Sequence, residues 1–401
     1  MTTDAPSVRL ASQRGTVLVQ VTVAMLALLA LSAFVFDYGV MWVSRGQAQN
    51  SADSAALSGA IALAFDDPDD KDAARAKAKA TASVNRVFGA APDVTDADIT
   101  FPACPPGSPG LPDTCVKVDV FRNQRPGGNP LPTFFARLVG ITQQGVQATA
   151  TAQVLAGNSA NCIKPWAVPD KWMELNPGPG EWLEDSTFDR YVPNGANAGS
   201  LMDPADVYIP PGETGHTGFT IEDDYGTPMV LKHGNPQQAI RPGWFFPVVI
   251  NPEEGPGGDN YRENIATCDP TVVGPGTLLE TEPGNMVGPT SQGMTDLINQ
   301  DRAAFWDPEA KDGQGAPSGG CMGAGTCAIS PRLVAIALFN VDTWAAARAG
   351  GRTEIRVVKI LGYWIERMQG NDVVGYLTHY PAMAAMTDDD STFLRTVILI
   401  R

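Results

Sequence analysis

The feature that most constrains the fold is an uncharged apolar segment from Thr16 to Phe36. As an α-helix rising about 1.5 Å per residue, this segment would be about 31 Å long, which matches the hydrocarbon core of a bilayer. A cleaved secretory signal would be shorter and would end at a small-residue cleavage site. This segment instead continues through Asp37-Tyr38-Gly39 into further helix-compatible sequence. We therefore expect residues 16–36 to form a retained transmembrane helix.

Charged residues on the two sides of this segment predict its orientation. Arg9 and Arg14 precede it and Asp37 follows it, so the basic excess lies on the N-terminal side. Because basic flanks tend to stay in the cytoplasm, we expect residues 1–15 to be a cytoplasmic tail. The rest of the chain would then lie outside the cytoplasm.

Small residues dominate the sequence that follows the apolar segment. Four of them recur at three- to four-residue spacing on one face of a helix: Ala48, Ala52, Ala55 and Gly59. Such a face allows another helix to approach closely. The alternative interpretation is that alanine is frequent here only because of its high helix propensity.

Three pieces of this region occur together: Arg14-Gly15, then Asp37-Tyr38-Gly39 after the apolar segment, and Gln49-Asn50-Ser51-Ala52-Asp53-Ser54-Ala55-Ala56-Leu57. In this combination, residues 1–65 resemble the N-terminal region of TadG-like proteins of the Flp (tight adherence) pilus machinery. The residues that carry the motif are Arg14, Gly15, Asp37, Gly39, Gln49, Asn50 and Asp53. The resemblance implies membrane attachment and envelope assembly, and it implies no catalysis.

Processing in the manner of a type IV prepilin is not expected. Such a prepilin is cleaved after a glycine and carries a glutamate five residues into the mature chain. If Gly15 were that glycine, Gln20 would occupy the glutamate position. Gln20 lacks the carboxylate that pairs with a terminal amine when subunits stack.

Residues 37–156 are expected to form a helical extension and a small α+β module. The acidic run at residues 66–70 breaks the first helix and favours the start of a second one. Alternating apolar residues predict half-buried strands at residues 116–120 and 146–154, with a short helix at residues 133–138 between them. This order of elements resembles the remainder of TadE/TadG-like pseudopilin domains.

A polar break at residues 157–161 predicts a domain boundary, and residues 157–401 are expected to form a larger β-rich domain. β-Branched and aromatic residues between turn signals predict strands that include residues 229–232, 244–250, 333–339, 354–365, 373–378 and 393–400. Several of these segments lack clean alternation, which predicts burial on both faces. The expected fold class is α+β, with an N-terminal transmembrane helix, a long helical extension, a small α+β module and a β-rich C-terminal domain.

Six cysteines lie beyond the apolar segment. An even number, confined to the part expected outside the cytoplasm, indicates disulfides. Six cysteines allow 15 pairings, so the sequence leaves the connectivity open. The pairs Cys104 with Cys115 and Cys321 with Cys327 each bracket a loop rich in glycine or proline, which leaves Cys162 and Cys268 as a long-range pair.

The charge balance indicates no nucleic-acid partner. The chain has 44 acidic and 28 basic residues, a formal net charge of −16. No basic cluster interrupts this excess strongly enough to attract phosphate backbones. Because an acidic surface keeps a protein soluble whatever its function, the charge identifies no other partner.

The chain contains residue types that can catalyse reactions or bind metals, but their spacing does not match that of known catalytic or zinc-binding motifs. His216, His233 and His379 have no second histidine or cysteine at a spacing suited to zinc. No Gly-x-Ser-x-Gly nucleophile elbow occurs. We therefore predict no catalytic residue, no cofactor and no metal site.

Two kinds of loop are weak candidates for ion binding. Acidic runs at residues 222–224, 259–260 and 388–391 contain oxygen ligands suited to calcium, but none has the spacing of an EF-hand loop. We interpret them as solvated loops. A glycine-rich run at residues 284–293 lacks the ending of a phosphate loop, so we interpret it as a loop that leads into a helix at residues 294–299.

These observations predict a single-pass protein of the bacterial cytoplasmic membrane. We expect a non-enzymatic component of Tad/Flp-type pilus or envelope assembly, with the membrane and other assembly proteins as partners. The helix and the C-terminal domain would make these contacts. The alternative is a membrane-tethered extracellular binding protein or adhesin, and a third possibility, an exported hydrolase, lacks any convincing set of residues.

Overall fold

The computed structural model describes residues 14–66, 70–108, 110–176, 178, 182–192, 196–197, 199–236, 238–347, 354–383 and 391–400. Three features predicted from the sequence lie mostly outside these residues. They are the N-terminal tail at residues 1–15, of which Arg14 and Gly15 are described, the acidic run at residues 66–70, of which Asp66 and Asp70 are described, and the acidic run at residues 388–391, of which Ser391 is described.

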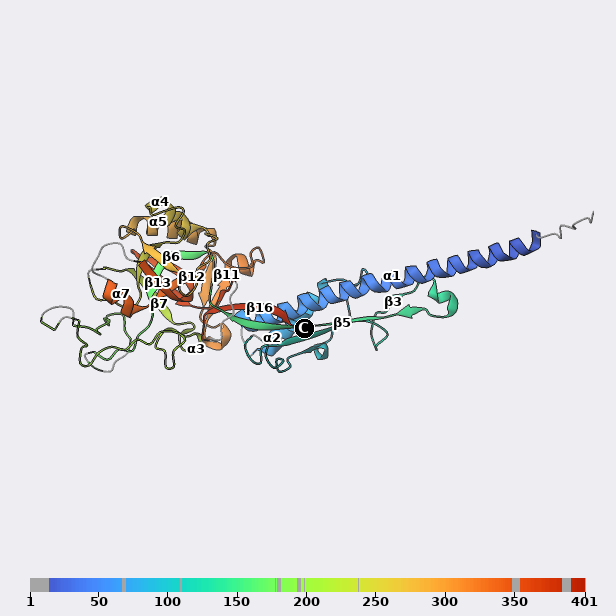
Figure 1. Cartoon of the computed structure of the whole chain (residues 1–401), viewed down its shortest axis with the longest axis horizontal. Helices are drawn as coiled ribbons and strands as arrows, with labels where there is room; N and C mark the ends of the chain where they lie inside the picture. The colour runs from blue at the N-terminus through green and yellow to red at the C-terminus, as the bar shows by residue number, and fades with distance from the viewer. Residues whose placement is uncertain are drawn as a thin grey trace, which may run out of the picture.

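The chain begins with one long helix. Helix α1 (Arg14–Phe65) is continuous through the predicted transmembrane segment and its extension. Its N-terminal part extends away from the rest of the molecule (Figure 1). Among the described residues, α1 is the one helix that is long and apolar enough to cross a bilayer.

The rest of α1 packs on a five-stranded sheet. The strands follow the order β1 (Ile99–Thr100), β2 (Val116–Arg122), β5 (Val146–Gly157), β16 (Leu394–Ile400) and β15 (Tyr380–Pro381). In β2, alternate side chains are buried, as the sequence pattern predicts. These side chains pack against α1 and against helix α2 (Lys71–Val84), which together cover one face of the sheet.

The small-residue face of α1 packs within this chain. Ala48, Ala52 and Ala55 are fully buried, and α2 contributes Ala74 and Ala78 to the same core. At Gly59, a Cβ atom would lie 2.8 Å from Cγ1 of Val116 and 3.3 Å from Cβ of Ala78. Close approach therefore explains this face, because α2 and β2 both lie against it.

A hairpin from the sheet reaches back along α1. Strands β3 (Leu131–Pro132) and β4 (Gln143–Gln144) flank a short 3₁₀ helix, η2 (Ala136–Val139). The hairpin lies beside the middle of α1 (Figure 1). The short helix predicted at residues 133–138 is present as a 3₁₀ turn, but it begins only at Ala136 and ends at Val139.

The larger part of the chain is built on a closed ring of strands. The ring runs through β12 (Leu333–Phe339), β6 (Ile163–Pro169), β8 (Trp244–Val249), β7 (Pro228–His233), β14 (Asp372–Leu377) and β13 (Glu354–Gln369), and β13 pairs again with β12. Strand β9 (Leu278–Thr281) bridges β13 and β8. β8 and β12 carry nearly unbroken runs of buried residues, so the burial on both faces that was predicted for such strands is confirmed. β6, which the sequence did not predict, is buried throughout as well.

Helices and a hairpin lie in the segments that connect the strands of this ring. The α-helices are α3 (Ile221–Asp224), α4 (Gly258–Ala266), α5 (Val287–Gln300), α6 (Gly320–Gly323) and α7 (Val341–Ala347). Strands β10 (Ala304–Asp307) and β11 (Ala316–Gly319) form the hairpin, with the 3₁₀ helix η3 (Lys311–Gly313) between them; a further 3₁₀ helix, η1 (Asp96–Asp98), precedes β1. Helix α5 begins well before the predicted start at residue 294. Pro289 lies in its first turn, where a missing N–H removes no intrahelical hydrogen bond.

All six cysteines form disulfides. Cys104–Cys115 and Cys321–Cys327 close the two loops rich in glycine or proline, and Cys162–Cys268 is the remaining, long-range pair. The long-range bond ties the start of β6 to the segment after α4. The other two close loops before β2 and after β11. Each bond therefore fixes a segment that has little regular structure of its own.

The predicted strand at the C-terminal end has an unexpected place. β16 pairs antiparallel with β5 from Leu394 opposite Gly157 to Ile400 opposite Thr151. It therefore belongs to the five-stranded sheet, although it follows the whole ring in sequence. The division of the chain into domains at residue 157 stays a prediction.

Candidate functional site

The environment of α1 changes sharply at residue 37. Large apolar side chains before this point are exposed, with Phe36 at 65%. Asp37, the next residue, is only 7% exposed. No residue of α1 before Asp37 is buried among the described residues, and the composition of this apolar stretch suits lipid contact.

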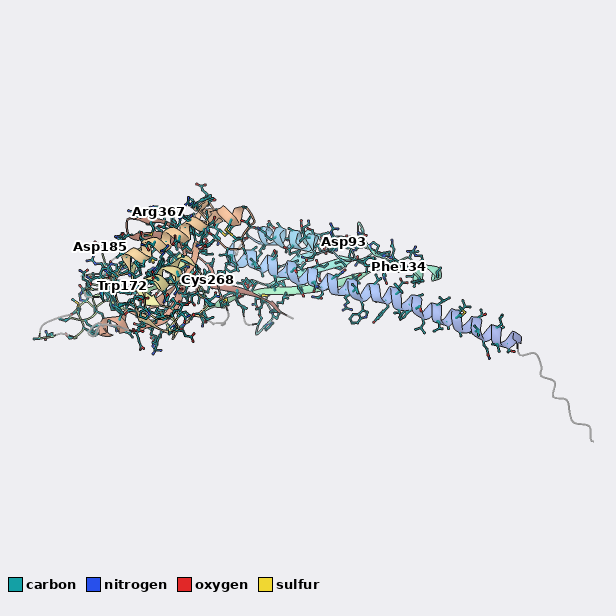
Figure 2. All side chains as sticks on the ribbon, turned by 90° about the horizontal axis from the view of Figure 1, so that it is seen from above. Asp93, Phe134, Trp172, Asp185, Cys268 and Arg367 are labelled. Atoms are coloured by element: carbon teal, nitrogen blue, oxygen red, sulfur yellow. A yellow bond between two sulfur atoms is a disulfide. The ribbon has the colours of Figure 1, made fainter. Side chains whose placement is uncertain are left out.

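Asp37 holds the hairpin against α1. Its Oδ1 accepts a hydrogen bond from the N–H of Phe134 at 2.7 Å. Its Oδ2 accepts from the N–H groups of Phe135 at 3.0 Å and Ala136 at 2.6 Å. These N–H groups lie at the start of η2, where no partner within the helix is available and a negative charge is favourable. Figure 2 shows Phe134 beside α1.

Gln49 makes a second link between the motif and the sheet. Its Nε2 donates to Oδ1 of Asp53 at 2.8 Å and to the carbonyl oxygen of Thr149 in β5 at 3.1 Å. Asn50 lies on the exposed side of α1. At Gly39 a Cβ atom would meet nothing within 4 Å, so space alone does not require glycine there.

Aromatic rings surround the point where the exposed part of α1 ends. Phe36 contacts Phe135 of the hairpin, with ring centroids 5.8 Å apart. Tyr38 stacks on Phe34 at 5.7 Å and contacts Trp42 at 6.3 Å. Both Tyr38 and Trp42 are exposed. This level of the helix therefore presents rings outward rather than into a protein core.

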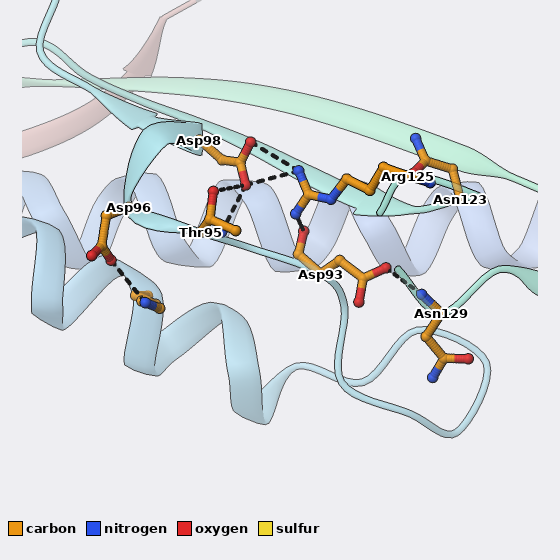
Figure 3. Close-up of polar contacts among 8 residues, drawn as sticks. Asp93, Thr95, Asp96, Asp98, Asn123, Arg125 and Asn129 are labelled. Carbon is orange, nitrogen blue, oxygen red and sulfur yellow. Dashed lines mark hydrogen bonds and ion pairs between the residues drawn. The ribbon is translucent and has the colours of Figure 1, made fainter. Parts of the chain in front are cut away.

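A polar network holds the base of the hairpin (Figure 3). The Arg125 guanidinium donates to Oδ1 of Asp98 at 2.9 Å and to the carbonyl oxygen of Asp93 at 2.6 Å. The carboxylate of Asp93 accepts from the N–H of Asn129 at 2.7 Å. The hairpin is thus attached at its base by these groups and near its tip by Asp37.

Two protein-family models together match the part of the chain that contains Asp37, the hairpin and its base. A family model described as Flp pilus-assembly TadE/G-like matches residues 15–62, and one described as Tad-like Flp pilus-assembly matches residues 46–152. The N-terminal region belongs to the TadE/G-like Flp pilus-assembly family. The predicted resemblance is confirmed. No curated protein and no solved structure matches the chain.

The described residues beyond the TadE/G-like region show no arrangement suited to a metal. No group of three or more His, Cys, Asp or Glu side chains is placed to hold an ion in the part of the chain that the structure describes. Within the acidic run at 222–224, Asp224 is buried and pairs with Lys171 at 2.7 Å. Its Oδ2 also accepts from the N–H of Thr220. This carboxylate is therefore part of the packing, not a solvated loop as predicted.

Two buried lysines beyond the TadE/G-like region bind backbone carbonyls. Lys164 Nζ donates to the carbonyl oxygens of Ile265 and Thr267, each at 2.7 Å. Burial lowers the pKa of Lys164 to about 7. Lys359 Nζ donates to the carbonyl oxygen of Phe219 at 3.0 Å. Both side chains join separate segments of the β-rich part.

A cleft of about 1020 Å³ separates the end of α1 from the β10–β11 hairpin. Phe65 and Ile329 line it together with Lys311 and His379. Burial, together with the charges of Lys311 and Arg395, holds the pKa of His379 well below its usual value. Its Nδ1 is buried without a hydrogen-bond partner among the described atoms. The cleft therefore combines apolar walls with a neutral imidazole.

Proposed function

We propose that this chain is a non-enzymatic, membrane-anchored component of a Tad/Flp-type pilus or envelope assembly. Family membership supports the assembly role. The observation that carries the anchoring role is the exposed apolar surface of α1 up to Phe36, which ends where Asp37 fixes the helix to its module. The β-rich part then projects from the membrane and contacts partner proteins.

The proposed orientation places residues 1–15 in the cytoplasm and the remainder outside it. The three disulfides support an oxidising location for the bulk of the chain. A direct test uses a single introduced cysteine and a thiol reagent that cannot cross the membrane, in intact spheroplasts. Val84 is an exposed residue of α2, so Val84→Cys is expected to react. Ser7→Cys is expected to react only after permeabilisation. The reverse pattern would contradict the orientation.

The assembly role is tested by photocrosslinking in native membranes. A photoreactive amino acid is placed at Val272 or Phe305, two exposed positions in the β-rich part. We expect mass spectrometry to identify pilin or pilus-secretion proteins in the crosslinked products. Samples without illumination are the control. If both positions capture no such protein while the chain is at native level, the assembly role is contradicted.

The alternative is a membrane-tethered extracellular binding protein or adhesin. The cleft between α1 and the β10–β11 hairpin favours it, because a concave site with apolar walls and a few polar groups is typical of ligand binding. Binding of a glycan or peptide by the purified full chain, abolished by Ile329→Asp in the cleft wall, would favour this alternative. Ligand binding would favour the adhesin alternative only if crosslinking also finds no assembly protein.

A further inference from the structure

The tip of the β3–β4 hairpin exposes large apolar side chains. We call Phe134, Phe135, Leu138 and Ile141 the hairpin patch; their side chains are 47, 41, 82 and 54% exposed. Soluble surfaces seldom expose such groups together, and a contiguous exposed apolar patch usually marks an interaction site. Leu131 and Thr133, at the base of the same hairpin, are buried and attach it to the module. The exposed apolar side chains at the tip are therefore not needed to hold the hairpin in place.

The hairpin patch is continuous with the exposed apolar surface of α1. The ring of Phe135 lies against Phe36, the last residue of the predicted transmembrane segment. The three hydrogen bonds to Asp37 fix the start of η2 at this level of the helix. Figure 2 shows Phe134 alongside α1. The patch therefore lies where the helix would leave the hydrocarbon core.

The composition of the hairpin suits a lipid surface. Arg137 is the one charged residue between Leu131 and Gln144. Its guanidinium donates to the carbonyl oxygen of Thr133 at 2.9 Å, and the residue as a whole is exposed. A cation among apolar side chains favours a bilayer surface that contains anionic headgroups. Tyr38 and Trp42 are exposed on α1 just beyond Phe36, and such rings are enriched at membrane interfaces.

We infer that the hairpin patch inserts into the interfacial region of the leaflet that receives the outer end of α1. This inference rests on the proposed anchoring role of α1. A single helix leaves its module free to rotate about the helix axis. A second lipid contact, held to the helix by Asp37, removes that freedom and determines which face of the five-stranded sheet points away from the membrane.

The test uses the full chain in liposomes of phosphatidylethanolamine and phosphatidylglycerol. All six native cysteines are paired, so one introduced cysteine can carry an environment-sensitive fluorophore. The three labelled variants are Leu138→Cys in the patch, Leu28→Cys in the predicted span and Val84→Cys on α2. Nitroxide groups on the lipid acyl chains and aqueous iodide serve as the two quenchers.

We expect the label at residue 138 to lose fluorescence to lipid nitroxide, as at residue 28, while the label at residue 84 responds to iodide alone. If residue 28 is quenched by lipid and residue 138 behaves like residue 84, the inference is wrong and the anchor is intact. A label at 138 that is shielded from both quenchers would indicate a protein contact, such as a second copy, and would also overturn it. Absence of lipid quenching at residue 28 would instead overturn the proposed anchor.

A second variant separates insertion from simple proximity. Asp37→Ala removes the acceptors that hold η2 to α1. Combined with the label at residue 138, it is expected to reduce lipid quenching there and to leave quenching at residue 28 unchanged. Unchanged quenching at both positions would contradict the role of Asp37 in positioning the patch.

Discussion

Oδ1 of Asp37 accepts a hydrogen bond from the backbone N–H of Phe134, 97 residues later in the chain. This contact gives a physical role to Asp37, which lies within the segment that the TadE/G-like family model matches. The carboxylate satisfies N–H groups at the start of a 3₁₀ helix and thereby attaches the hairpin to the helix that carries the anchor.

Replacing Asp37 with Ala is expected to free residues 134–136. Their N–H groups would lose their acceptors and become open to solvent. Hydrogen exchange measured by mass spectrometry should show faster exchange in the peptide that contains them. Asp72→Ala, which alters an exposed carboxylate on α2, is the matched control and should leave that peptide unchanged. Equal exchange in the two variants would show that Asp37 does not cap this turn.

Two glycines of α1 should respond in opposite directions to alanine. At Gly46 a Cβ would meet nothing within 4 Å, so Gly46→Ala should stabilise the protein by about 0.5–1 kcal/mol through helix propensity. At Gly59 the Cβ would lie 2.8 Å from Val116, so Gly59→Ala should destabilise it by roughly 1–3 kcal/mol. Urea unfolding in detergent, followed by far-ultraviolet circular dichroism, measures both changes. A stabilising Gly59→Ala would mean that the helix and β2 are less closely packed than described.

The disulfides should differ in their contribution to stability. Cys162–Cys268 spans 106 residues, and Cys321–Cys327 spans 6. In the loop-entropy model, replacing the first pair by serine costs about 4–5 kcal/mol, and replacing the second costs about 2 kcal/mol. Chemical unfolding followed by tryptophan fluorescence would rank the two double variants. An equal loss would indicate that loop length does not govern the effect here.

Stability should rise with pH above neutrality because of Lys164. Burial lowers its folded pKa to about 7, below the ordinary value of 10.5, so between these values the unfolded chain binds more protons than the folded one. Unfolding free energy should therefore increase by up to roughly 1.4 kcal/mol per pH unit in this window, and not below it. In Lys164→Met this contribution should be absent, whereas the exposed Lys77→Met should keep it. Parallel pH curves for the wild type and Lys164→Met would contradict the prediction.

Much of the fold follows from local sequence patterns. The uncharged segment from Thr16 to Phe36 predicts the exposed half of α1, and alternation predicts β2 and the first part of β5. Continuous apolar residues predict β12 and the middle of β13. In each case the pattern of one segment suffices, because burial on one or both faces sets its periodicity.

Other features depend on partners that local patterns do not reveal. β6 contains Pro165 and Pro169, which read as turn signals, yet it is buried on both faces within the ring. Asp37 looks like a charge at the end of a membrane span, and its partners are backbone N–H groups, which leave no side-chain signature. The pairing of β16 with β5 joins segments separated by the whole ring, so the β-branched residues of β16 predict a strand without predicting its sheet.

That pairing also imposes an order on biosynthesis. β5 ends at Gly157 and β16 begins at Leu394, so the TadE/G-like module lacks its fourth strand until the ring has been synthesised. A chain that stops early leaves the edge of β5 open and able to pair with other strands. The sheet beside the anchor can therefore be completed only after translation has passed through the distal part.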